Sequence, residues 1–159
     1  MSQRAAELAR QFEQAVADFA RTVEGCSDAQ WAAACKAEGW SVAQTAQHVS
    51  GQFPLEMEFI TAGADGKSLP TYTWDDINGK NDSRAAKNGS VSKADVLKEL
   101  RAGASSTAAY IRALSDEQLD RTGALPLAGG ASVSTQQLIE GGVLIGHVTG
   151  HLESINTAG

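Results

Sequence analysis

The residues whose type and spacing point most directly to chemistry are the histidines, of which the chain has three: His48, His147 and His151. His147 and His151 are four residues apart, and on an α-helix the side chains of such a pair lie on one face, about 6 Å from each other. Two neutral imidazoles held in this way can bind one divalent metal ion. The residue after His147 is valine and not glutamate, so the zinc-protease motif is absent.

A third ligand could come from His48, which lies within a second helical segment on the edge of its apolar stripe, beside Leu55 and Phe59. Three imidazoles from two helices would leave one coordination position open, as in catalytic rather than structural zinc sites. Glu140 lies on the same face of the helix as His147 and His151, but roughly 10 Å away from His147 along the helix axis. We therefore do not expect Glu140 to bind the metal. No carboxylate next to the ligands indicates a general base. The alternative is that the histidines are hydrogen-bonded core residues.

The long segments with helical periodicity are the elements that must position these histidines. Apolar residues recur every three or four positions, and Ser or Thr capping signals precede them, in four stretches: 3–24, 41–61, 92–114 and 134–156. Pro54 lies inside the second stretch, and we expect a kink or break near residues 51–53. The last stretch is apolar almost all round, which predicts a buried helix.

The segments between these stretches are polar or short. Residues 62–90 are rich in Gly, Asn, Asp, Lys and Ser and predict a long crossover connection, with one weak helix over 74–87. Short helices are expected over 27–36 and 115–118, and a loop over 123–132, where residues between Leu125 and Val133 could pair as a hairpin. The pattern predicts an all-α protein: a four-helix bundle with an up-and-down core and one long crossover connection, in a single domain of residues 1–159.

Composition excludes several classes of partner. The formal net charge is −6 and the cationic residues are scattered, which argues against binding to nucleic acid or to a membrane surface. The N-terminus has charges where a secretory signal would be apolar, and no apolar run could span a membrane, so we expect a cytoplasmic protein. Cys26 and Cys35 match neither a disulfide framework nor a zinc ribbon, and we expect free thiols without a catalytic role.

Two runs of the sequence carry a resemblance to a known family. GWSVAQTAQHV, from Gly39 to Val49, and GHVTGHLESI, from Gly146 to Ile155, together resemble the DinB/YfiT-like superfamily of metal-dependent four-helix-bundle proteins. The resemblance covers essentially the whole chain, although Pro54 and the glycines of the last helix depart from the family pattern.

This resemblance implies a role for individual residues. It implies that His48, His147 and His151 are the metal ligands and that Trp40 packs at the start of the second long helix. Relatives often carry an asparagine on the crossover, where this chain has Asn78 and Asn81. We expect these two asparagines and Trp74 to line the mouth of a substrate site.

The family includes thiol-dependent S-transferases and a thiol-dependent maleylpyruvate isomerase. The resemblance therefore implies a divalent metal, zinc or nickel, that activates a low-molecular-weight thiol for S-transfer to, or isomerisation of, a small-molecule substrate. One alternative is a metal-hydroxide hydrolase. Another is a stress-response bundle that binds a metal or small ligand without turnover, with a homodimer as an expected assembly. A third is an interaction module whose histidines are core residues.

Overall fold

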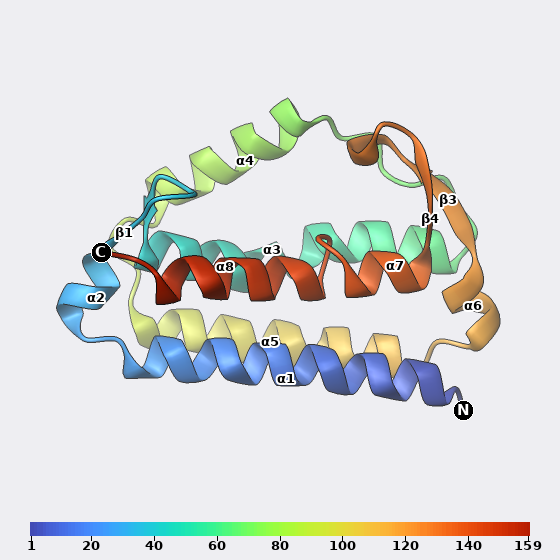
Figure 1. The fold of residues 1–159 in the computed structure, drawn as a ribbon, viewed down its shortest axis with the longest axis horizontal. Coiled ribbons are helices and arrows are strands. Elements are labelled where there is room, and N and C mark those ends of the chain that lie inside the picture. Colours follow the sequence, from blue (N-terminus) through green and yellow to red (C-terminus); the bar gives the residue numbers. More distant parts are fainter.

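Four long helical segments form the bundle in the computed structural model, which describes residues 1–159. They are α1 (Gln3–Gly25), α3 (Val42–Ala64), α5 (Lys93–Arg112) and a fourth segment divided into α7 (Thr135–Glu140) and α8 (Ile145–Asn156) (Figure 1). The shorter helices are α2 (Asp28–Ala32), α4 (Trp74–Lys87) and α6 (Asp116–Asp120). The all-α prediction is confirmed, and the weak helix expected over 74–87 has the predicted bounds.

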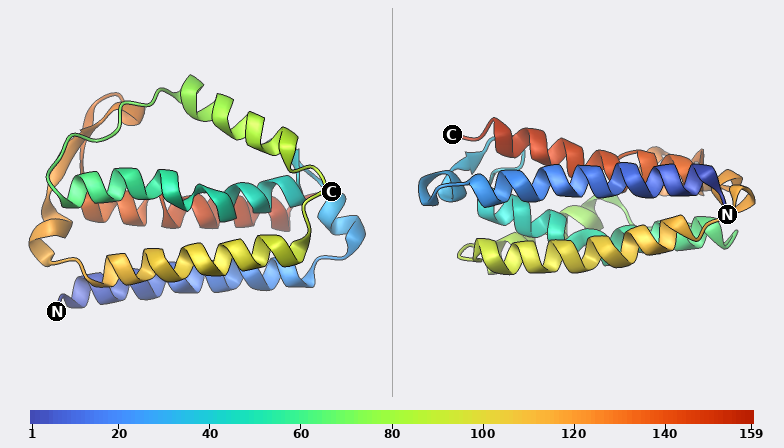
Figure 2. Two further views of the ribbon diagram at one scale, coloured as in Figure 1. Left: turned by 180° about the vertical axis from the view of Figure 1, so that it is seen from behind. Right: turned by 90° about the horizontal axis from the view of Figure 1, so that it is seen from below.

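The order of the helices differs from the expected up-and-down arrangement. In Figure 1, α1 and α8 run from right to left, whereas α3 and α5 both run from left to right. Helix α1 packs against α5 and α8, and α3 packs against the same two helices. The crossover that contains α4 passes outside α3 (Figure 2, left) and returns the chain to the end where α3 begins. The long crossover is therefore confirmed and the up-and-down order is wrong, because α5 starts at the same end as α3.

One hydrophobic core joins the long helices. It contains 32 buried residues, among them the apolar stripe of α1, and the ring of Phe12 meets that of Phe53 on α3 edge to face, with centroids 5.6 Å apart. At the start of α3 the side chain of Ser41 accepts from the backbone N–H of Gln44, and the Gln44 side chain accepts from the N–H of Ser41. This reciprocal capping fixes where the helix that carries His48 begins.

Helix α3 continues through Pro54 without the break expected near residues 51–53. Proline removes one backbone hydrogen bond of the helix. Its ring lies on the exposed side of α3, where there is room for it, while Phe53, Phe59 and Ile60 on the other side are buried in the core. The packing of the apolar face thus holds the helix together across the proline.

The last long helix is interrupted, contrary to the continuous helix expected over 134–156. Gly141 adopts an extended conformation after α7, with φ −86° and ψ −158°, and its carbonyl accepts from the N–H groups of Leu144 and Gly146 at 3.2 and 2.8 Å. A side chain at Gly146 would bring its Cβ within 2.8 Å of the Gly141 carbonyl. Glycine at position 146 therefore permits the tight turn that starts α8 just before His147.

This close approach leads to a prediction on stability. We expect Gly146→Ala to lower the free energy of unfolding by about 1–3 kcal/mol, because the added methyl group must displace backbone that cannot yield cheaply. A Cβ at Gly150, on the same helix, would meet nothing within 4 Å, so Gly150→Ala should raise stability by up to about 1 kcal/mol. Urea denaturation of both variants measures the difference, and equal stability would contradict the assigned role of Gly146.

Two small hairpins complete the fold. Strand β1 (Ala34–Cys35) pairs antiparallel with β2 (Trp40–Ser41), so the short helix expected over 27–36 is wrong in its second half, where the chain turns to reach α3. Strand β3 (Thr122–Leu125) pairs with β4 (Ala131–Ser134), and the short 3-10 helix η1 (Pro126–Ala128) connects them. This second hairpin confirms the pairing expected between Leu125 and Val133. No helix combines the length and hydropathy that crossing a membrane requires.

Candidate metal centre

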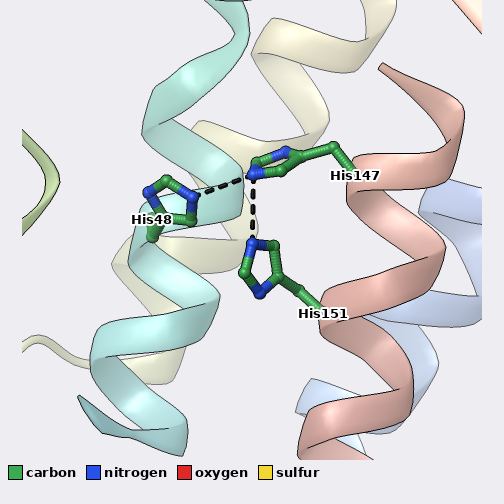
Figure 3. A group of neighbouring side chains, drawn as sticks. All are labelled: His48, His147 and His151. Carbon is green, nitrogen blue, oxygen red and sulfur yellow. Dashed lines mark hydrogen bonds between the residues drawn. The ribbon is translucent and has the colours of Figure 1, made fainter. Parts of the chain in front are cut away.

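The three histidines meet between α3 and α8 (Figure 3). The Nε2 atom of His147 lies 2.8 Å from Nε2 of His48 and 3.1 Å from Nε2 of His151. His48 comes from α3, and the pair from consecutive turns of α8. The structure therefore brings together the three residues that the sequence indicated, with one nitrogen of each ring directed at a common point.

Two buried carboxylates contact the outer nitrogens of these rings. Oε1 of Glu56 lies 2.5 Å from Nδ1 of His147, and Oε1 of Glu38 lies 2.9 Å from Nδ1 of His151. Glu56 is on α3 and Glu38 is in the turn between β1 and β2, and both side chains are less than a tenth exposed. A carboxylate that accepts the proton of Nδ1 leaves Nε2 as the nitrogen that can bind a metal.

Sequence reasoning missed both carboxylates, and the expectation that none would lie next to the ligands is wrong. Glu56 carried a signal: His48, Gln52 and Glu56 are spaced four residues apart and form a buried polar row on one face of an apolar helix. Glu38 carried none, because its contact with His151 depends on a hairpin of two-residue strands that was not expected.

The surroundings keep the rings of His48 and His151 neutral. Burial lowers the pKa of His48 to about 2, and the two neighbouring histidines add to the effect. Burial also lowers the pKa of His151, and this outweighs the opposing influence of Glu38. For Glu56, burial raises the pKa of the carboxyl against the effect of the contact with His147. Neutral imidazole is the form that binds a metal, so no proton has to be displaced from His48 near pH 7.

The arrangement of nitrogens fits a cation better than it fits hydrogen bonding. Nδ1 of neutral His151 donates to Glu38, so Nε2 of His151 presents a lone pair, 3.1 Å from Nε2 of His147. A four-coordinate ion with bonds of about 2.0–2.1 Å requires nitrogens roughly 3.3 Å apart. The two distances from Nε2 of His147, 2.8 and 3.1 Å, are close to that spacing, and imidazole is a donor type that zinc and nickel accept.

A cavity of about 610 Å³ opens beside the histidines, and all three line it. The structure places Trp74, Asn78 and Asn81 of α4 in the lining of this cavity as well. The indole N–H of Trp74 donates to the carbonyl of Leu127 at 2.9 Å, which connects α4 to the β3–β4 hairpin across the cavity. The ring of Trp40 lies against that of His48, with centroids 5.2 Å apart.

The remaining candidates lie outside this centre. Glu140 is exposed and accepts from the side chain of Gln136 at 2.7 Å, in agreement with the expectation that it is not a ligand. Cys26 and Cys35 are free, buried and absent from the cavity lining. Burial raises the pKa of both thiols, which makes them poor nucleophiles.

Comparison with protein families identifies the chain. Residues 12–141 match the mycothiol maleylpyruvate isomerase N-terminal domain family, and the chain belongs to this family, within the DinB-like superfamily. The matched segment contains His48, Glu38 and Glu56 but ends before His147 and His151. The comparison with curated proteins found no match.

Solved structures share the fold. YfiT from Bacillus subtilis, described as a probable metal-dependent hydrolase with an unusual four-helix bundle topology, has a TM-score of 0.77 and 18% identity over 98% of this chain and 86% of its own. An uncharacterized protein from Clostridium difficile 630 has a TM-score of 0.73 and 12% identity over 98% and 95% of the two chains. The mycothiol-dependent maleylpyruvate isomerase has a TM-score of 0.65 and 11% identity over 98% of this chain, which spans 60% of the isomerase.

Proposed function

We propose that this protein is a metal-dependent enzyme of DinB type in which His48, His147 and His151 hold a divalent ion, zinc or nickel. A low-molecular-weight thiol would bind at the open coordination position and react with a small electrophile by S-transfer, or promote its isomerisation. The observation that carries the proposal is the convergence of the three Nε2 atoms beside an open cavity, with carboxylates on Nδ1 of His147 and His151. The family's namesake, a mycothiol-dependent isomerase, makes mycothiol the first thiol to test.

A bound divalent ion would supply a deprotonated thiol at neutral pH. Glu38 and Glu56 hold the rings of His151 and His147 in the orientation that points Nε2 at the common centre. Glu56 also lines the cavity, and both of its carboxylate oxygens are buried without a hydrogen-bond partner. Because burial raises its pKa, this carboxyl would accept a proton released by the thiol more readily than an exposed glutamate.

The other cavity residues would bind and orient the electrophile. Leu55 and Phe59 of α3 offer apolar surface close to the histidines, and the side-chain amides of Asn78 and Asn81 can hydrogen-bond to carbonyl or hydroxyl groups. Trp74, anchored on Leu127, closes one side of the cavity mouth and limits the access of water.

The second candidate function is a metal-hydroxide hydrolase. The same buried Glu56, which lines the cavity, favours it, since this carboxyl could take a proton from water as well as from a thiol. YfiT, which shares the fold, is described as a probable hydrolase.

The proposal is tested with protein purified without a histidine tag. We expect elemental analysis to find zinc or nickel at about one ion per chain, because the three nitrogens form one site. After cobalt substitution, titration with mycothiol or glutathione should produce a sulfur-to-metal charge-transfer band, which His151→Ala should abolish. Thr149→Ala, an exposed position between the paired histidines, is the control and should retain the band. Absence of the band with every thiol, together with ester or amide hydrolysis, would reject thiol transfer in favour of the hydrolase.

A further inference from the structure

The cavity beside the histidines has a one-sided charge. Its lining includes three acidic residues, Glu38, Glu56 and Asp82, and no lysine or arginine. The guanidinium of Arg84 lies close by, but it donates to the side chain of Gln52 at 3.1 Å and is not part of the lining. Proteins that bind dicarboxylates usually provide arginine, whose planar guanidinium matches a carboxylate in two parallel hydrogen bonds. This cavity has no such group.

A divalent ion at the histidines would not reverse this balance. Glu38 on the His151 ring matches one of its two positive charges, and Glu56 on the His147 ring matches the other when it is ionised. The third carboxylate, Asp82, is exposed on α4 at the edge of the cavity. The formal sum over the ion and the lining side chains is then zero with Glu56 protonated and negative with Glu56 ionised, so in either state an incoming dianion gains no net attraction.

The rest of the lining suits an uncharged ligand. Ten of its twenty residues are hydrophobic, among them Phe59, Ile77 and Val143. The polar groups of α4, Asn78 and Asn81, are neutral amides. A volume of about 610 Å³ lies within the range of cavities that enclose small organic molecules.

We propose that the electrophile of this enzyme is uncharged or cationic, with an apolar body, and that the cavity discriminates against dicarboxylates such as maleylpyruvate. The inference rests on the proposed function in taking this cavity as the substrate site. It sets this protein apart from the isomerase that gives the family its name, and it identifies Asp82 as a specificity-determining residue.

The local charge can be measured without knowing the substrate. Ala128→Cys adds one sulfur at a lining position outside α4, and the two native thiols are buried. The thiol is reacted with three methanethiosulfonates of similar size: the neutral hydroxyethyl, the cationic aminoethyl and the anionic sulfonatoethyl reagents. Ala6→Cys, exposed on α1 beside the ion-paired Glu7 and Arg10, corrects for the intrinsic reactivity of each reagent.

In the zinc-loaded protein, the quantity compared is the reaction rate of the neutral or cationic reagent divided by that of the anionic reagent. We expect this ratio to be about tenfold larger at position 128 than at position 6. Asp82→Lys should reduce this preference, whereas Glu153→Lys, the same charge change at an exposed site of α8 outside the cavity, should not. Equal or faster reaction of the anionic reagent relative to the control would overturn the proposal, as would an unchanged preference in Asp82→Lys. These rates do not depend on thiol binding to the metal, so failure of the cobalt experiment would reject the proposed function separately.

Discussion

Replacement of any one of His48, His147 and His151 by alanine is expected to lower the affinity for zinc or nickel by about a hundred- to a thousandfold. Apparent binding energies of about 10–16 kcal/mol for zinc, divided among three or four ligands, leave about 3–4 kcal/mol for each ligand. The side chains of Glu38 and Glu56 cannot replace a lost ligand without giving up their contacts with the remaining rings. Competition with a chromophoric chelator measures the loss.

The fold should survive these substitutions. The hydrophobic core of 32 residues contains none of the three histidines, so circular dichroism of the alanine variants should remain that of the wild type. Thr149→Ala, on the exposed side of α8, serves as the control and should bind metal normally. Stoichiometric metal in all three histidine variants, or none in the wild type, would show that the three-histidine assignment is wrong.

The second prediction concerns the carboxylate that the sequence did not reveal. We expect Glu56→Gln to lower metal affinity by about 10- to 100-fold, the usual effect of removing a carboxylate that orients a ligand histidine. Glutamine has nearly the same size but is neutral and is a weaker acceptor, so it holds the His147 ring less firmly and makes Nε2 less basic. Metal affinity is measured by competition with the same chelator.

The matched control for this experiment is Glu58→Gln. Glu58 is two residues further along α3, where its side chain accepts from the hydroxyl of Tyr72 at 2.9 Å and does not line the cavity. Removal of the negative charge of Glu58 should leave metal affinity unchanged within about twofold, because exposed charges are screened by solvent. If the two variants lost the same affinity, the effect would come from net charge and not from the contact with His147.

Local sequence determined the helices and the histidine pair. The apolar repeats and capping residues predicted the bounds of α1, α3, α4 and α5 to within a few residues, because helix periodicity and capping depend on neighbours in the chain. The spacing of His147 and His151 placed both rings on one face of α8 for the same reason. His48 was the one further histidine, and the resemblance to the DinB-like superfamily, which the family match confirms, implied the same ligand role for it.

The tertiary structure alone decided which groups surround the histidines. His48 meets His147 across 99 residues because the crossover sets the order and direction of the helices, and no local pattern encodes that direction. Glu38 reaches His151 through a hairpin of two residues per strand, which is too short to leave a periodic signal. The interruption before α8 arises from a carbonyl of Gly141 that approaches Gly146, a contact that depends on backbone conformation. The cavity and its missing cationic groups likewise result from packing, since side chains from α3, α4, α8 and both hairpins line it together.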